Sequence, residues 1–159
     1  MHALTTLLLT LAPPPFQWHW PAVREHWPHV SVELEASVQV GALVGGLIGD
    51  IDPRWLVATA FVESSFRPEV VGDRGTSFGL CQLKRRTARG AWPVVTTSLL
   101  LDPVVNLTVA GAVYRRIIAK YGRARAQSVF GCGVRCVGMT KGAQAKWVWW
   151  RRLAGYAPS

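Results

Sequence analysis

The chain has 159 residues, of which 50% are apolar, and a formal net charge of +9. This length fits one domain with a real hydrophobic core, and the absence of internal repeats excludes a repeat architecture. Ten Lys and Arg follow Asp102, whereas no acidic residue does. A positively charged surface attracts an anionic polymer, a nucleic acid or an anionic membrane, and charge alone does not distinguish these partners.

Residues 1–31 are expected to be an N-terminal apolar segment followed by an aromatic arm. The apolar run from Ala3 to Ala12 is long enough for the core of a secretory signal and too short to span a bilayer. It lacks a basic start, so whether it is a signal or an anchor stays open. The tryptophans, histidines and prolines of residues 16–27 predict an irregular aromatic arm. The four histidines keep no metal-ligand spacing, and we expect neither a metal nor a cofactor.

Residues 32–159 are expected to form the folded domain, which begins with a helix from Val32 to Gly49. Glycines at positions 41, 45, 46 and 49 indicate close contacts between this helix and its neighbours. A small-residue motif for dimers within a membrane is the alternative interpretation. The apolar stretch is judged too short for it.

A second helix is predicted from Pro53 to Phe66, with Asp52 as its N-cap. Glu63 is the only carboxylate within this otherwise apolar helix. Helical spacing aligns Glu63 with apolar residues, so a charge there loses water and its pKa should rise. A carboxylic acid that stays protonated near neutral pH can act as a general acid. The alternative is a glutamate at a helix end that points to solvent.

The segment from Gly72 to Gln82 contains three glycines and several small polar residues. Such a composition predicts a short antiparallel hairpin whose backbone bends closely around a ligand. Ser77, Gln82 and exposed backbone amides would offer hydrogen bonds to a polar ligand. An ordinary surface hairpin is the alternative.

Ordered sequence blocks connect the glutamate helix to the rest of the domain. They are Glu63-Ser64, Gly79-Leu80-Cys81-Gln82, Thr87-Ala88, Asp102-Pro103-Val104-Val105-Asn106, Gly111-Ala112-Val113-Tyr114 and Lys120-Tyr121-Gly122. In this order and at similar spacings, they resemble the pattern of lytic transglycosylases (SLT domain) of the goose-type lysozyme superfamily. The resemblance covers roughly residues 50–153.

This resemblance implies a mainly α, lysozyme-like helical domain with one short β-hairpin beside the active-site groove. It implies cleavage of the β-1,4 bond between N-acetylmuramic acid and N-acetylglucosamine in peptidoglycan, with Glu63 as the single acid and base and a 1,6-anhydro product. Ser64 would brace the helix end or the glutamate, and Asn106 would tie its helix to neighbouring loops. Substrate-binding residues would be Ser64, Asp73, Ser77, Phe78, Gly79, Gln82 and Phe130. A lysozyme-type hydrolase that uses Glu63 with Asp73 is the alternative.

Two segments depart from the family pattern. Val129-Phe130-Gly131-Cys132-Gly133 stands where the family usually has Ala-Tyr-Asn-Ala-Gly, which removes a tyrosine hydroxyl and an asparagine amide. Phe130 can still provide an apolar wall, but another group would have to orient the acid. The loop after Glu63 is one residue longer than usual, and Asp73 or Gly72 stands where many members carry a serine. An inactive structural component of a virion or secretion apparatus, binding the wall or a membrane, is therefore a second alternative.

The C-terminal segment from Lys146 to Leu153 mixes tryptophans with cations. It is either the last helix of the domain, packed on the core, or an interfacial helix that contacts an anionic membrane or wall polymer. No specific nucleic acid partner is expected, and the oligomeric state is not predicted. The expected location is the cell envelope, with carriage in a phage particle as one setting. Cys132 and Cys136 are expected to be free thiols, and Cys81 a small buried side chain.

Overall fold

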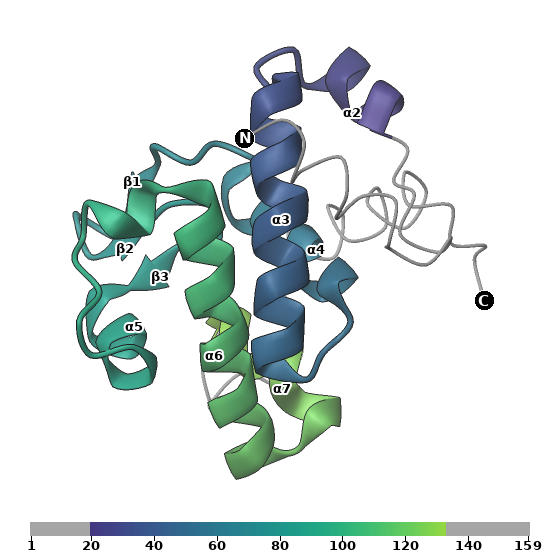
Figure 1. The fold of residues 1–159 in the computed structure, drawn as a ribbon. Helices are drawn as coiled ribbons and strands as arrows, with labels where there is room; N and C mark the ends of the chain where they lie inside the picture. The colour runs from purple at the N-terminus through teal and green to yellow at the C-terminus, as the bar shows by residue number, and fades with distance from the viewer. Residues whose placement is uncertain (1–19, 133–159) are drawn as a thin grey trace.

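The computed structural model describes residues 20–132. Most of these residues are helical, and a small antiparallel sheet lies at one side of the molecule (Figure 1). The helices are α2 (Trp20–His26), α3 (Val32–Gly49), α4 (Pro53–Ser64), α5 (Arg85–Ala91), α6 (Pro103–Tyr121) and α7 (Ala126–Cys132), with 3-10 turns η2 (Leu99–Leu101) and η3 (Arg123–Arg125). The strands, in sheet order, are β1 (Val71–Gly72), β2 (Ser77–Phe78) and β3 (Leu83–Lys84). The mainly α, lysozyme-like fold is confirmed, and the predicted hairpin β1-β2 gains β3 as a third strand.

Helices α3 and α6 pack side by side and form the centre of the fold (Figure 1). A Cβ atom built on Gly111 of α6 would overlap the carbonyl oxygen of Gly45 on α3, so the two backbones touch there. Helix α3 spans the predicted residues, and its glycines make the predicted close contacts. Contrary to expectation, α3 is long and apolar enough to cross a membrane by length and composition. In this fold, however, its glycine face is occupied by α6.

We expect Gly111→Ala to lower the free energy of unfolding. Alanine is intrinsically better than glycine inside a helix by about 1 kcal/mol, but here its methyl group would meet backbone rather than a movable side chain. Gly90→Ala in α5 is the matched control, because its new methyl group would meet only the flexible end of Arg116, at 3.0 Å. Urea denaturation of both variants measures the difference. Equal stability of the two variants would contradict the tight α3-α6 contact.

Helix α4 begins as predicted and ends two residues early. The Asp52 side chain accepts a hydrogen bond from the Arg54 backbone N–H at 2.9 Å, which confirms it as the N-cap. Ser65 and Phe66 have φ values of 53° and 61°, in the left-handed region, and therefore cannot continue the helix. This reversal buries the Phe66 ring in the core and leaves Glu63 in the last turn of α4.

The segment before α3 is more regular than the sequence indicates. Residues 16–27 were expected to be an irregular arm, whereas Trp20–His26 forms helix α2. The ring centroids of Trp20 and Phe66 lie 5.5 Å apart, and those of Trp27 and Phe61 lie 4.9 Å apart. Aromatic contacts of this kind give the short helix an apolar surface to bury, which local periodicity does not reveal. The segment thus packs against the end of α4 that carries Glu63.

Several predicted features lie outside the described residues. These are the apolar run from Ala3 to Ala12, the tryptophans and cations from Lys146 to Leu153, Gly133, and the thiols of Cys132 and Cys136.

Candidate functional site

A cavity of about 570 Å³ opens between the end of α4, the sheet, and the facing parts of α6 and α7. Its wall contains one acid from α4, polar groups from the sheet, and apolar groups from α6 and α7. The lining residues are Glu63, Gly72, Asp73, Ser77, Cys81, Gln82, Leu83, Lys84, Thr87, Val113, Ile117, Val129, Phe130 and Gly131. Five of the predicted site residues, Glu63, Asp73, Ser77, Gln82 and Phe130, thus meet in one cavity.

Glu63 is half-buried in the wall of this cavity. A Cβ atom on Gly131 would lie 3.5 Å from the Glu63 Oε1 atom, so the carboxylate faces α7. Burial raises the pKa of the Cys81 thiol, and the negative charge of Glu63 raises it further. The carboxylate, the thiol and α7 therefore surround the same space. This placement is what a general acid at the end of an apolar helix requires.

Tyr114 is the site residue whose role the sequence analysis missed. It is completely buried beneath the cavity, and its hydroxyl oxygen lies 2.8 Å from Thr59 Oγ1. Because Thr59 donates its own proton to the Trp55 carbonyl at 2.7 Å, Tyr114 is the donor to Thr59. Burial is the main cause that raises the pKa of the Tyr114 hydroxyl, so it stays neutral. The sequence feature that could have indicated this role is the position of Tyr114 at the end of the matching block Gly111 to Tyr114.

Phe130 takes its position in the cavity wall by stacking on Tyr114. The ring centroids lie 4.4 Å apart, with an angle of 11° between the ring planes. This contact ties α7, where the chain departs from the family pattern, to α6. Thr59, the partner of Tyr114, lies one helical turn before Glu63 on α4. The Tyr114 hydroxyl therefore reaches α4 one turn before the acid, where its partner is Thr59.

Asp73 in the turn after β1, Ser77 in β2 and Lys84 in β3 form a polar cluster beside the sheet. Ser77 Oγ donates to Asp73 Oδ2 at 2.8 Å, and Lys84 Nζ lies 3.4 Å from the same oxygen. The hydrogen bond from Ser77, followed by the proximity of Lys84, holds the pKa of Asp73 below its usual range. Asp73 is therefore ionised at neutral pH, and two positive or donating groups already engage one of its oxygens.

Gln82 holds the hairpin with its amide nitrogen. Nε2 donates to the carbonyl oxygens of Val70 at 3.0 Å and Gly79 at 2.9 Å. A Cβ atom on Gly72 would overlap Oε1 of Gln82, so this oxygen packs directly against the glycine backbone. Because both amide protons have backbone acceptors, Oε1 is the part of the side chain left to accept a bond from a ligand.

Asn106 joins the sheet side of the site to α6. Its Oδ1 accepts from the Cys81 backbone N–H at 2.8 Å, and its Nδ2 donates to the carbonyls of Phe78 at 3.0 Å and Leu100 at 2.6 Å. The side chain is completely buried. The predicted architectural role of Asn106 is confirmed, and so is the burial of Cys81 as a free thiol.

Three predicted binding residues, Ser64, Phe78 and Gly79, do not line the cavity. Ser64 Oγ donates to the Ala60 carbonyl at 2.9 Å within α4, which braces the helix end. Gly79 has φ of 71°, and a Cβ atom there would overlap the Leu100 carbonyl oxygen. These residues shape the wall from behind, and direct contact with a substrate stays a prediction. Within residues 20–132, no group of three His, Cys, Asp or Glu side chains could hold a metal ion.

Comparison with known families agrees with this geometry. The family model of the transglycosylase SLT domain matches residues 46–156, which is well over half of the chain. No curated protein and no solved structure matches the chain significantly. The matched range contains every residue of the cavity wall. The chain therefore belongs to the transglycosylase SLT domain family.

Proposed function

We propose that this chain is a peptidoglycan lytic transglycosylase in which Glu63 is the single acid and base. Family membership supports action on peptidoglycan in general. The observation that carries the mechanism is the pair of carboxylates in the cavity wall. Glu63 is half-buried at the end of an apolar helix, whereas Asp73 is ionised and engaged by Ser77 and Lys84. Of the two carboxylates, Glu63 is the more withdrawn from water, and partial burial favours the protonated form of an acid.

In the proposed reaction, protonated Glu63 donates its proton to the glycosidic oxygen between N-acetylmuramic acid and N-acetylglucosamine, and the bond to C1 of the muramic residue breaks. The acetamido group of the substrate steadies the anomeric carbon. The Glu63 carboxylate then accepts the proton of the muramic C6 hydroxyl, whose oxygen attacks C1 and closes a 1,6-anhydro ring. The enzyme ends in its starting protonation state, and no water is consumed.

The cavity wall supports this outcome because one side of it is apolar. Val129 and Phe130 come from α7, and Val113 and Ile117 from α6. An apolar wall beside the acid disfavours an ordered water and so favours the internal hydroxyl as nucleophile. A hydrolase would need a base that activates water. Asp73 is a weak candidate for that base because its pKa is lowered and Ser77 already donates to it.

Mass spectrometry of digested sacculi tests the proposal. We expect muropeptides that end in 1,6-anhydromuramic acid and are lighter by one water than products with reducing ends. Reducing ends would instead support the hydrolase that uses Glu63 with Asp73. Intact sacculi would support a binding component without activity. Since peptidoglycan lies in the cell envelope, we propose that the protein acts there.

We expect Asp73→Asn to keep cleavage within about threefold of the wild type, because the proposed mechanism needs no second carboxylate. The substitution should also change the acid stability of the hairpin. Because the pKa of Asp73 is lower in the folded state, its ionised form stabilises the fold at pH values above its ordinary pKa of 3.8. This contribution is lost as the pH falls below 3.8 and through the lowered pKa. Rates on sacculi and melting temperatures between about pH 3 and 7 measure both effects. Loss of cleavage with intact folding would favour hydrolysis.

A further inference from the structure

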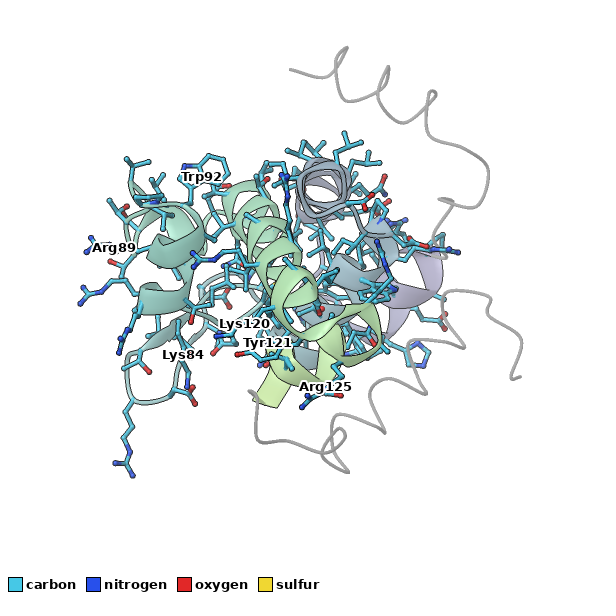
Figure 2. All side chains as sticks on the ribbon, turned by 90° about the horizontal axis from the view of Figure 1, so that it is seen from below. Lys84, Arg89, Trp92, Lys120, Tyr121 and Arg125 are labelled. Carbon is cyan, nitrogen blue, oxygen red and sulfur yellow. The ribbon has the colours of Figure 1, made fainter. Side chains whose placement is uncertain are left out.

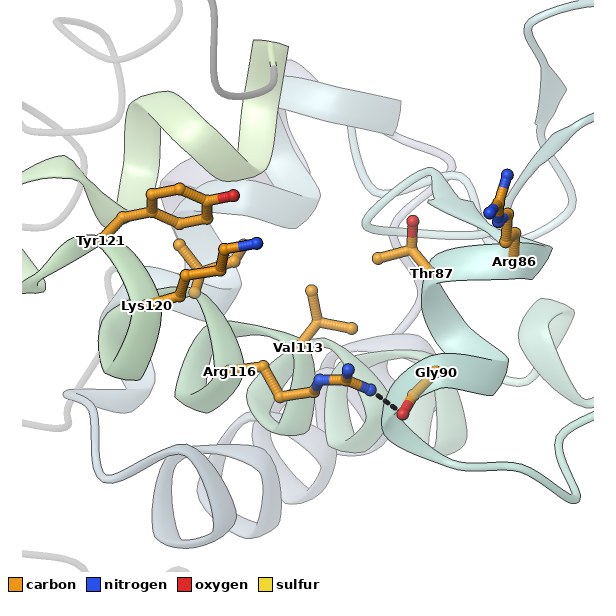
Figure 3. A pocket seen from close by; sticks show the side chains of 8 residues that line it. Arg86, Thr87, Gly90, Val113, Arg116, Lys120 and Tyr121 are labelled. Carbon is orange, nitrogen blue, oxygen red and sulfur yellow. Dashed lines mark hydrogen bonds between the residues drawn. The ribbon is translucent and has the colours of Figure 1, made fainter.

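A second cavity, of about 430 Å³, lies between α5 and the C-terminal half of α6. Its lining residues are Arg86, Thr87, Gly90, Val113, Arg116, Ile117, Lys120 and Tyr121. Figure 3 shows Lys120 and Tyr121 pointing from the end of α6 toward Thr87 of α5. The proposed reaction at Glu63 uses neither Arg86, Arg116, Lys120 nor Tyr121.

This cavity adjoins the one that contains Glu63. Thr87, Val113 and Ile117 line both cavities, so the two lie side by side along α6. A polymer seated at Glu63 can therefore extend along α6 or send a substituent in that direction. The ligand of the second cavity is most simply another part of the same substrate.

The lining of the second cavity is cationic. Arg86, Arg116 and Lys120 are three of its eight residues, and none of the eight is acidic. The Arg116 guanidinium donates to the Gly90 carbonyl, which fixes it across the gap between α6 and α5 (Figure 3). The Lys120 ammonium lies 5.3 Å from the centroid of the Tyr121 ring. Two of the cations thus make contacts within the fold, Arg116 with the Gly90 carbonyl and Lys120 with the Tyr121 ring.

Another cation lies beside this cavity. Figure 2, which views the molecule from below, shows the Arg125 side chain on the same side as Lys120 and Tyr121. The field around a concave surface with one sign of charge concentrates ligands of the opposite sign. The ligand should therefore carry negative charge.

We propose that the second cavity is a subsite for an anionic substituent of the glycan strand, bound by Arg86 and Lys120 with Thr87 and Tyr121 hydroxyls beside them. This inference rests on the proposed function, because it takes the glycan at Glu63 as the neighbouring ligand. The anionic group that these cations would bind is a carboxylate or a phosphate. In a cell wall the carboxylates belong to the stem peptide on muramic acid, and the phosphates to an attached wall polymer.

The test compares the wild type with Arg86→Gln/Lys120→Gln on three preparations of sacculi: untreated, freed of wall polymer with peptides kept, and freed of both polymer and peptides. The matched control is Arg67→Gln/Arg115→Gln, which removes the same charge from two exposed arginines that line neither cavity. On untreated sacculi we expect the test variant to lose about 3- to 10-fold in kcat/KM, mainly through KM, and the control to lose less.

The preparations identify the source of the charge. If the difference between test and control variants persists without polymer and disappears without peptides, the subsite binds stem-peptide carboxylates. If it disappears when the polymer alone is removed, the subsite binds phosphates. A difference that persists on bare glycan assigns the charge to the lactyl carboxylate that peptide removal leaves on muramic acid. No difference on untreated sacculi overturns the proposal.

A binding measurement keeps the inference separate from catalysis. Cosedimentation with the same sacculi is repeated with each double variant in a Glu63→Gln background. If the wild type proves unable to cleave any preparation, the proposed reaction fails. The subsite is then judged by whether Arg86→Gln/Lys120→Gln weakens sedimentation by about 3- to 10-fold more than the control does. Equal sedimentation would overturn it.

Discussion

Glu63→Gln is expected to reduce the cleavage of purified sacculi by at least about 10²-fold, and to leave folding and glycan binding nearly unchanged. The amide has almost the same shape as the acid but cannot donate a proton to the glycosidic oxygen or take one from the C6 hydroxyl. Because both proton transfers use this one group, no second residue replaces it. Release of soluble muropeptides measures the rate, and cosedimentation with sacculi measures binding.

Glu69→Gln provides the matched control for this experiment. Glu69 is an exposed carboxylate six residues further along the chain and does not line the cavity. The same chemical change there should leave the cleavage rate within about twofold of the wild type. Glu63→Asp, which keeps the acid but shortens its reach, should retain more activity than Glu63→Gln. If Glu63→Gln clears sacculi as fast as the Glu69→Gln control, Glu63 is not the catalytic acid.

The dependence of the rate on pH follows from the same assignment. Glu63 must be protonated to start the reaction, so kcat/KM should fall as the pH rises through the pKa of this acid. Burial and the Glu63 charge raise the pKa of the Cys81 thiol, and Asp73 titrates below its usual range. Neither group therefore changes charge between about pH 5 and 8, and a single ionisation should describe this part of the profile.

Helix positions were predictable where the sequence supplies local signals. The range of α3 agrees with the glycine-rich apolar segment from Val32, and the start of α4 agrees with Asp52 followed by Pro53. Caps and prolines act through bonds within a few residues, so they can be read without knowledge of the fold. The end of α4 was missed by two residues, because the reversal at Ser65 depends on the burial of Phe66. Helix α2 was missed because it too depends on burial against distant residues, such as the contact of Trp20 with Phe66.

The candidate site was predictable as a set of residues but not as a set of contacts. Glu63, Asp73 and Phe130 come from distant segments, and the resemblance to a family placed them together before the structure did. The resemblance does not say which contacts surround a position where this chain departs from the family pattern. Phenylalanine at position 130 indicates the loss of a hydroxyl, whereas the contact between Tyr114 and Thr59 is visible only in three dimensions.

Gln82 also shows that a motif predicts which residues form the site but not what each side chain contacts. A glutamine in a motif indicates a polar group near the substrate, and Gln82 does line the cavity. Its amide nitrogen, however, bonds the carbonyls of Val70 and Gly79. Residues that appear to be ligand contacts in a motif can therefore serve mainly to hold the loop that forms the wall.

Asn106→Leu is expected to lower the free energy of unfolding by about 3 to 5 kcal/mol. Leucine has the same number and branching of side-chain heavy atoms as asparagine, but it leaves three buried backbone groups without their partners: the N–H of Cys81 and the carbonyls of Phe78 and Leu100. Each unpaired buried group costs roughly 1 to 3 kcal/mol, and some relaxation of the hairpin should recover part of that cost. Urea denaturation measures the change.

Thr108→Val is the matched control for this prediction. Thr108 is a buried polar residue on the same helix, and it makes none of the three contacts of Asn106. Its replacement should cost about 1 kcal/mol or less. Below its unfolding transition, Asn106→Leu should also cleave sacculi more slowly than Thr108→Val, because Cys81 and the hairpin form one wall of the cavity that contains Glu63. Equal stability of the two variants would show that the hairpin is held to α6 by packing and not by the Asn106 hydrogen bonds.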